Sequence, residues 1–222
     1  MMWGKRMTFK GVIFDFNGTL YWDTQLHNVA WDLFLEKNRI FLSDEEKNTR
    51  IHGKNNIDIL KSLFTRELSL KDIDEMSIEK EDIYQSLCLK HKLGLAPGSV
   101  SFFKFLTKNR IPYTIATAAD LYNVDFYFKH LDLGFYFDKS KVIYSDGTLK
   151  SKPDPEIFRK AMTVLGLKEG EVLIFEDSTS GIEAAENAKV KKIIIVNSTN
   201  NDYSKWNHQV ITSFEEVDRA LF

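Results

Sequence analysis

Short apolar runs recur along the chain, and polar or turn-forming residues follow each of them. Five runs rich in β-branched and aromatic residues cover residues 10–14, 112–116, 141–144, 171–175 and 192–196, and a weaker sixth covers residues 209–211. Runs that are apolar throughout, rather than in alternation, are typical of strands in a parallel sheet covered on both faces. The pattern therefore predicts a buried parallel sheet.

Helical patterns separate the predicted strands. Residues 98–110 and 121–131 carry apolar side chains at helical spacing. Asp154 and Pro155 indicate the N-cap and the first residue of another helix, and Ser180 with Glu183 indicates a capping box. Strands that alternate with helices predict an α/β fold with a Rossmann-like, doubly wound parallel sheet.

Residues 23–96 contain no convincing strand. Helical patterns cover residues 26–37, 43–50, 56–64 and 80–91. Ser43 and Glu46 form a capping box at the start of the second of these. We therefore expect an α/β core of residues 1–22 plus 97–222 and an inserted α-helical cap of residues 23–96.

Composition narrows the class of protein. Lys and Arg number 30 and Asp and Glu 32, which gives a net charge of −2, and nucleic-acid-binding domains usually show a basic excess. The single cysteine, Cys88, excludes an internal disulfide framework. The first residues lack the pattern of a signal peptide, and no apolar stretch approaches the ~20 residues of a membrane helix. We expect a cytoplasmic monomer or weak dimer with no nucleic-acid or membrane partner.

Chemically active side chains follow the predicted strands. Asp15 comes after the first strand, Thr117 after the second, Lys152 in the loop after the third, and Glu176 and Asp177 after the fourth. In an open α/β sheet these positions meet at one edge. A carboxylate can attack phosphorus, Mg²⁺ prefers oxygen ligands, and a lysine and a hydroxyl can hold phosphoryl oxygens. The set predicts metal-dependent phosphoryl transfer.

The same residues resemble the four motifs of the haloacid dehalogenase superfamily. The sequence DFNGTL from Asp15 is similar to the first motif and Thr117 to the second. Lys152 with Pro153 is similar to the third motif, and the sequence FEDS before residue 179 is similar to the fourth. The predicted cap lies where the β-phosphoglucomutase-like branch carries its helical cap. The resemblance implies a Mg²⁺-dependent phosphatase or phosphotransferase that acts on a small phosphorylated metabolite through an aspartyl phosphate.

The resemblance also implies roles for individual residues at the metal. Asp15 would be the nucleophile and a Mg²⁺ ligand. The residue at Asn17 would give its backbone carbonyl to the metal, and Asp177 would be the remaining carboxylate ligand. Glu176 would lie nearby, outside the ligand set.

A second group of residues would bind the phosphoryl group and the substrate. Thr117, the backbone after it at Ala118, and Lys152 would hold the phosphoryl group, and Thr19 would support the loop. In the cap, His27 at its start and Lys54 in a later loop would face the substrate. These roles are likewise implied by the resemblance.

Asn17 departs from the pattern of the family's phosphatases, which carry Asp at this place. That Asp protonates the leaving oxygen and then activates water, whereas an amide can do neither. General acid–base catalysis is typically worth ~10²–10⁴-fold in rate. Four interpretations stay open: substrates with good leaving groups, a proton carried by His27, a catalytically impaired relative that only binds, or an introduced substitution.

Two further chemistries compete with phosphate hydrolysis. A mutase would carry Arg at Asn56 to grip a second phosphate, and Lys54 would replace it only in part. A dehalogenase of this family needs neither the second Asp nor a metal, so Asn17 would permit it. The acidic pair Glu176 and Asp177 favours a cation nearby and hence the phosphatase.

Overall fold

The computed structural model describes residues 8–51 and 54–222, so residues 1–7 at the start of the expected core lie outside the described part. Six strands form one sheet in the order β3-β2-β1-β4-β5-β6, and every neighbouring pair is parallel. The strands are β1 (Gly11–Phe14), β2 (Tyr113–Asp120), β3 (Ile143–Ser145), β4 (Val172–Glu176), β5 (Lys192–Val196) and β6 (Gln209–Ile211). All six predicted segments therefore form strands.

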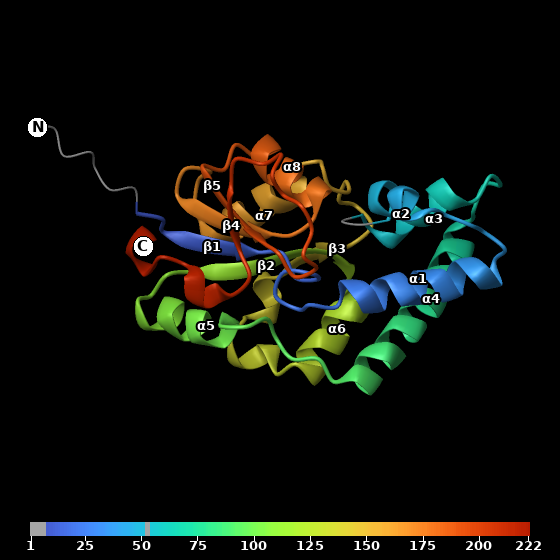
Figure 1. The fold of residues 1–222 in the computed structure, drawn as a ribbon, viewed down its shortest axis with the longest axis horizontal. Coiled ribbons are helices and arrows are strands. Elements are labelled where there is room, and N and C mark those ends of the chain that lie inside the picture. The colour runs from blue at the N-terminus through green and yellow to red at the C-terminus, as the bar shows by residue number, and fades with distance from the viewer. Residues whose placement is uncertain (1–7, 52–53) are drawn as a thin grey trace, which may run out of the picture.

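Helices cover both faces of the sheet. In the view of Figure 1, α7 and α8 lie above it and α5 and α6 lie below it. Their bounds are α5 (Ser99–Lys108), α6 (Leu121–His130), α7 (Glu156–Leu165) and α8 (Thr179–Asn187). This is the predicted Rossmann-like, doubly wound α/β architecture.

The central strands β1 and β4 are almost entirely apolar because each of their two faces meets a different layer of helices. In β1, Val12 and Phe14 join the cluster formed with α5 and α6, whereas Ile13 joins the cluster formed with α7 and α8. β4 divides in the same way, with Leu173 on one side and Ile174 on the other. The continuous apolar pattern thus reflects burial from both sides.

Aromatic rings fill the core on the side of α5. The Phe14 ring stacks on Phe175 with centroids 5.2 Å apart and meets Phe102 and Phe103 edge-on at 6.0 and 5.5 Å. Aromatic pairs in these geometries stabilise a core beyond the area that they bury. Phe14 precedes Asp15, so this packing also fixes the end of β1.

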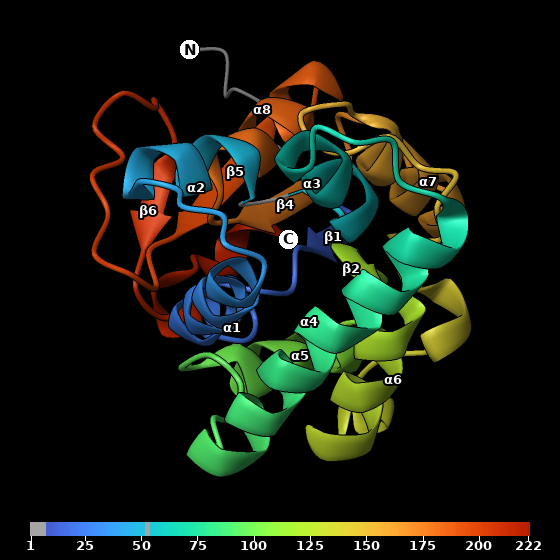
Figure 2. The ribbon, with the colours of Figure 1, turned by 90° about the vertical axis from the view of Figure 1, so that its right-hand side faces the viewer.

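Residues after β1 form four helices beside the carboxyl end of the sheet, as Figures 1 and 2 show. They are α1 (Thr24–Lys37), α2 (Asp44–Arg50), α3 (Asn56–Leu63) and α4 (Leu70–His91). They enclose an apolar cluster of their own, which includes Trp31, Phe34 and Leu60. Ala96 N–H donates to Leu20 C=O at 2.8 Å, so the two chain segments that join these helices to the sheet lie side by side.

Of two helix starts predicted within residues 23–96, one is confirmed and the other is wrong. The Ser43–Glu46 capping box is present as predicted. The helix expected over residues 80–91 begins ten residues earlier, at Leu70, where Ser69 and Asp72 cap it reciprocally. The first half of α4 is charged and largely exposed, so its apolar stripe is too sparse to predict a helix.

Other element ends differ from the prediction. The capping box at Ser180 was wrong: Ser178 is the N-cap of α8, and its Oγ accepts the Gly181 N–H at 3.1 Å. Helix α7 begins after Pro155, not at it, although Asp154 Oδ1 accepts the Glu156 N–H at 3.0 Å.

Strand β2 extends to Asp120, four residues beyond the predicted end, because it pairs with β3 at Ser145. Thr117 therefore lies within β2 rather than in the loop after it.

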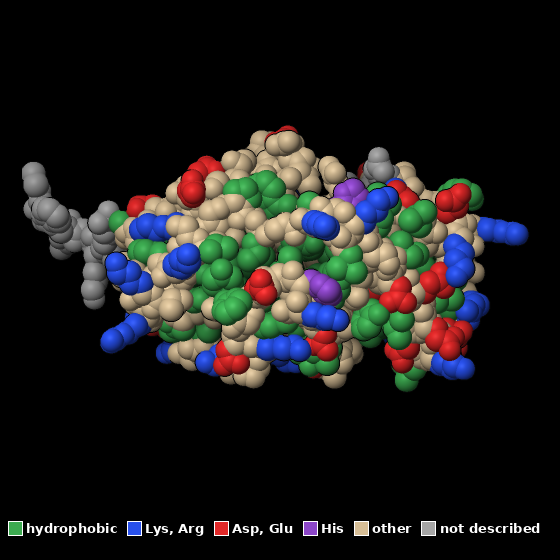
Figure 3. Space-filling model, turned by 90° about the horizontal axis from the view of Figure 1, so that it is seen from below, with side chains coloured by type: hydrophobic (Ala, Val, Ile, Leu, Met, Phe, Trp, Pro, Cys, Tyr) green, Lys and Arg blue, Asp and Glu red, His purple; other side chains and the backbone are tan. Residues whose placement is uncertain are grey.

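The surface carries charges of both signs. On the face shown in Figure 3, Lys and Arg side chains are interspersed with Asp and Glu side chains. Within the described part of the chain, no helix is long and apolar enough to cross a bilayer.

The Phe14 ring provides a test of the core. We expect Phe14→Ala to lower the free energy of unfolding by about 3–5 kcal/mol, because it removes a buried ring and leaves a cavity. Phe135→Ala is the matched control, since the Phe135 side chain is 84% exposed. Urea unfolding of both variants measures the difference. Equal losses would contradict the packing described for Phe14.

Candidate active site

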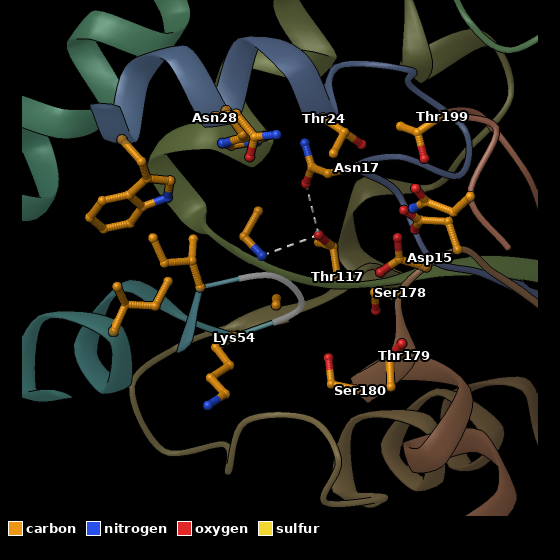
Figure 4. A pocket seen from close by; sticks show the side chains of 18 of the residues that line it. Asp15, Asn17, Thr24, Asn28, Lys54, Thr117, Ser178, Thr179, Ser180 and Thr199 are labelled. Carbon is orange, nitrogen blue, oxygen red and sulfur yellow. Dashed lines mark hydrogen bonds between the residues drawn. The ribbon is translucent and has the colours of Figure 1, made fainter. Parts of the chain in front are cut away.

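A cavity of about 560 Å³ lies between the carboxyl end of the sheet and the cap helices (Figure 4). Most of the site residues predicted from sequence line it: Asp15, Asn17, His27, Lys54, Thr117, Ala118 and Asp177. Thr19 and Lys152 are buried beside it and do not line it. Figure 4 shows Lys54 across the cavity from Asp15.

Three carboxylates converge at the sheet edge of this cavity. Oxygens of Asp15, Glu176 and Asp177 all lie within 4.8 Å of one another. The Lys152 ammonium donates to Asp15 Oδ1 and to Glu176 Oε1, each at 2.5 Å. Both ion pairs are almost completely buried. One buried ammonium thus pairs with two buried carboxylates, and the half-buried carboxylate of Asp177 lies beside them.

Burial and the excess of negative charge shift the pKa values of Asp15, Asp177 and Lys152. Burial raises the pKa of Asp15 to about 7, with Glu176 adding to the rise and Lys152 opposing it. Burial, then the charges of Glu176 and Asp15, raise the pKa of Asp177 well above its usual range. Burial lowers the pKa of Lys152, but the two carboxylates outweigh it and raise the pKa. The site lacks positive charge, and its hard oxygen donors suit Mg²⁺.

Two glycines permit the close approach of these carboxylates. A Cβ at Gly181 would lie 1.6 Å from Glu176 Oε1, and a Cβ at Gly18 would lie 2.1 Å from Asp177 Oδ2. Gly18 also has a φ of +79°, which side-chain-bearing residues rarely adopt. Glu176 Oε2 accepts the N–H groups of Asp177 and Ser178 at 2.7 Å, so its carboxylate is fixed at the start of α8.

The two threonines of the predicted site make different contacts. Thr19 donates to Asp177 Oδ1 at 2.9 Å and so supports a carboxylate rather than the cavity. Thr117 Oγ1 accepts the Ala119 N–H at 3.1 Å, the contact of a hydroxyl-stabilised turn, and donates to Asn17 Oδ1 at 3.5 Å. A dashed line in Figure 4 marks the contact between Asn17 and Thr117.

The side-chain amide of Asn17 is hydrogen-bonded, on the side away from Thr117, to a buried polar cluster. Its Nδ2 donates to Asp23 Oδ2 at 2.6 Å and to the Tyr127 hydroxyl at 2.7 Å. The carboxylate of Asp23 is fully buried and also accepts the Tyr84 hydroxyl and the Gly18 N–H. Burial and the charge of Asp23 raise the pKa values of both tyrosines, so their hydroxyls remain protonated donors. Only the amide oxygen of Asn17 stays available for other contacts.

Sequence reasoning did not find this cluster. Asp23 follows Asn17 by six residues, and its acidic side chain at the end of the loop is a signal that a reader of the sequence could have used. Tyr84 and Tyr127 come from α4 and α6, 67 and 110 residues beyond Asn17. No local pattern predicts that these two helices place their hydroxyls together.

His27 lines the cavity, but both of its ring nitrogens have partners. Nδ1 lies 3.0 Å from Lys80 Nζ, and Nε2 lies 3.4 Å from Asp23 Oδ2. The ring stacks on Tyr84 with centroids 3.8 Å apart. An ammonium beside Nδ1 requires that nitrogen to accept, so Nε2 carries the proton and faces Asp23.

The cap contributes a second polar wall. Glu81 Oε1 accepts from Lys80 Nζ at 2.9 Å and from Asn56 Nδ2 at 2.7 Å. Burial opposes the ionisation of Glu81, but the Lys80 ammonium, together with hydrogen bonds such as that from Asn56, outweighs it and keeps the pKa of Glu81 below its usual range. This end of the cavity therefore holds a paired ammonium and carboxylate beside neutral amides.

Comparison with known proteins agrees with this geometry. Residues 9–189 match the family described as haloacid dehalogenase-like hydrolase. The chain belongs to the haloacid dehalogenase-like hydrolases. The match spans the whole sheet edge that carries the carboxylates, together with the cap.

Individual relatives of this hydrolase are similar over most of its length. A "phosphorylated carbohydrates phosphatase" of Thermotoga maritima is 29% identical over 196 residues, which cover 87% of this chain and 88% of the relative. A solved family IA, variant 3 hydrolase from Entamoeba histolytica is 32% identical with a TM-score of 0.83, covering 95% and 96%. A β-phosphoglucomutase from Clostridium difficile shares the fold, with a TM-score of 0.79 at 22% identity over 96% and 94%.

Lys152 provides a test of the charge balance. We expect Lys152→Met to lower the free energy of unfolding by about 3–5 kcal/mol, since it leaves buried carboxylates without their ammonium. Adding Glu176→Gln to Lys152→Met should recover part of that loss. Lys160→Met, at an exposed pair with Glu156, is the control. An unchanged urea midpoint in Lys152→Met would contradict the prediction.

Proposed function

We propose that this haloacid dehalogenase-like hydrolase is a Mg²⁺-dependent phosphatase or phosphotransferase of small phosphorylated metabolites, working through an aspartyl phosphate on Asp15. One observation carries the proposal: three carboxylates, of which Asp15 and Glu176 are buried and Asp177 is half-buried, gather around a single ammonium that pairs with the first two. Phosphoryl transfer needs a carboxylate nucleophile next to a cation, and this arrangement supplies the first and favours the second.

The metal would be held by the carboxylates of Asp15 and Asp177 and by the backbone carbonyl of Asn17. Bound there, Mg²⁺ would neutralise charge on the phosphoryl oxygens. Glu176 would remain outside the ligand set, because its two oxygens are already occupied by Lys152 and by backbone N–H groups. The raised pKa values of Asp15 and Asp177 support a cation at this place.

The protein itself would bind the phosphoryl group from the other side. Thr117 and the backbone after it at Ala118 line the cavity beside Asp15 and would donate to phosphoryl oxygens. Lys152, paired with Asp15, would hold the nucleophile in place and counter the developing charge. Thr19 would act through Asp177, to which its hydroxyl donates.

Asn17 would make the second step of the reaction, hydrolysis of the aspartyl phosphate, slow. Both N–H groups of its amide are used by Asp23 and Tyr127, so its oxygen can orient a water molecule but cannot take its proton. His27 does not replace the missing carboxylate, because both of its ring nitrogens are engaged. Substrates with good leaving groups, or transfer to an acceptor other than water, suit such a site.

The cap wall favours a hydroxyl-bearing substrate with one phosphate. Asn56 and the Lys80–Glu81 pair offer donors and acceptors to hydroxyl groups, and the pairing with Glu81 leaves less of the Lys80 charge for a second phosphate. The Thermotoga maritima relative is described as a phosphatase of phosphorylated carbohydrates. A phosphorylated carbohydrate therefore fits better than the bisphosphate of a mutase.

The cap of residues 23–96 would close over this substrate and exclude water from the core of residues 1–22 plus 97–222. A protein that binds the phosphorylated metabolite without turning it over is the second candidate. This candidate is favoured by the amide of Asn17, whose N–H groups are already hydrogen-bonded and which cannot carry a proton. Turnover of an activated substrate would exclude it.

Asp15 provides the direct test of the proposal. We expect Mg²⁺-dependent release of phosphate from p-nitrophenyl phosphate and acetyl phosphate, and a fall by about 10³-fold or more in Asp15→Asn. Asp125→Asn, at an exposed ion pair with Lys139, is the control and should keep the parent rate. Equal rates with and without Mg²⁺, or in Asp15→Asn, would overturn the proposal.

The role of Asn17 predicts the time course of the reaction. With p-nitrophenyl phosphate in excess, we expect a burst of about one equivalent of nitrophenol per active site, followed by slower steady release. The burst arises because nitrophenolate leaves without protonation by an acid, whereas hydrolysis of the aspartyl phosphate depends on water that no base activates. Stopped-flow absorbance measures both phases. A linear time course in a fully active sample would show that hydrolysis of the intermediate is not limiting.

A further inference from the structure

The cluster beneath Asn17 is a closed ring of hydrogen bonds. Asn17 Nδ2 donates to Asp23 Oδ2 at 2.6 Å and to the Tyr127 hydroxyl at 2.7 Å. Tyr127 donates to the Tyr84 hydroxyl at 3.2 Å, and Tyr84 donates to the same oxygen of Asp23. Asn17 Nδ2 is thus connected to Asp23 Oδ2 twice, once directly and once through the hydroxyls of Tyr127 and Tyr84.

The ring has a fixed count of donors and acceptors. The amide nitrogen gives two N–H groups, to Asp23 Oδ2 and to the Tyr127 hydroxyl, and also lies 3.4 Å from the Tyr84 hydroxyl. Asp23 Oδ2 receives two hydrogen bonds within the ring and lies 3.4 Å from His27 Nε2 outside it. Each phenol accepts one bond and passes one on. Asp23 and both tyrosines are at least 98% buried, so water cannot make up a missing partner. One amide and one carboxylate at positions 17 and 23 satisfy this count, and Asn17 is the member of the ring that is half-buried and lines the cavity.

We propose that Asp23 is a positioning residue for Asn17 and that the two positions form one exchangeable amide–carboxylate pair. Asp23 holds the N–H groups of Asn17 away from the cavity and leaves the amide oxygen on the side of Thr117. The residue at position 23 then determines whether position 17 must carry an amide or a carboxylate. The turnover measurements that test this pairing rest on the proposed function, whereas the stability measurements do not.

An exchange of the two side chains would reverse the four hydrogen bonds of the ring. The contact that it would not conserve is that of Asp23 Oδ2 with His27 Nε2 at 3.4 Å, outside the ring. In Asn17→Asp/Asp23→Asn, the amide at position 23 would donate to the carboxylate at position 17 and to Tyr84. Tyr84 would then donate to Tyr127, and Tyr127 to position 17. The oxygen of the new amide would still accept the Gly18 N–H, as Asp23 Oδ1 does at 3.0 Å.

Either single change would break the ring. In Asn17→Asp, two carboxylate oxygens would lie where the structure has a 2.6 Å hydrogen bond, and they would either repel each other or share one proton, which leaves fewer donors for the ring. In Asp23→Asn, the amides at positions 17 and 23 would compete for acceptors, because the only carboxylate of the ring has gone.

A double-mutant cycle tests the pairing. We expect each single variant to lower the thermal midpoint by about 5 °C or more, and the exchanged variant to return to within about 2 °C of the parent. Asn17→Asp combined with Asp125→Asn is the matched control: it conserves net charge but changes a carboxylate outside the ring, and its effects should add. Failure of Asn17→Asp to fold while the exchanged variant folds would equally support the pairing.

Turnover adds a readout that a purely structural role would not change. The exchanged variant places a carboxylate at position 17 with its ring intact. We expect its kcat for an alkyl phosphate to rise about 10²-fold over the parent with little change in KM. Asn17→Asp alone should gain much less.

Two results would overturn the proposal: additive shifts in the thermal midpoint, or Asn17→Asp matching the exchanged variant in both stability and kcat. Loss of turnover in all four proteins would count against the proposed function instead, and the thermal cycle would still decide the pairing.

Discussion

The imbalance of buried charge at the carboxyl end of the sheet is the constraint on which the site depends. Asp15, Glu176 and Asp177 lie within 4.8 Å of one another, and Lys152 neutralises only part of their charge. Separating these groups would cost packing, since Gly18 and Gly181 bring backbone to within contact of the carboxylates. The fold therefore maintains a place where additional positive charge is favourable, and this is the physical basis for a cation next to the nucleophile.

Sheet order explains why these residues meet. β1 is central, with β2 on one side and β4 on the other, so the chain changes direction across the sheet between β1 and β4. Open α/β sheets have their binding crevice at such a switch point. Asp15 and Asp177 end the two strands that flank it, and Thr117 lies on the next strand. The cap then needs only to cover a site that the core has already assembled.

The sequence predicted the features that local patterns determine. β1, β4 and β5 could be predicted because burial on both faces makes each an almost continuous apolar run, whereas the edge strands β3 and β6 are only partly buried. Most of the sheet-edge residues could be predicted because they follow strand ends, although Thr117 lies within β2. The start of α4 was missed because its first half is charged and exposed. The ring beneath Asn17 was missed because Tyr84 and Tyr127 come from helices far apart in sequence. Tertiary packing alone places their hydroxyls against Asp23.

Asn17 by itself is compatible with dehalogenation as well as with phosphoryl transfer, and its surroundings separate the two. A displacement at carbon on an anionic haloacid would meet the uncompensated charge of Glu176 and Asp177, whereas a metal-bound phosphoryl group would use it. The ring beneath Asn17 adds a different constraint. On the pairing proposed for Asn17 and Asp23, a carboxylate at position 17 would need a second change at position 23. A proton carrier at this site would then be separated from the present sequence by two linked substitutions, and each single substitution is expected to leave an unmatched buried group.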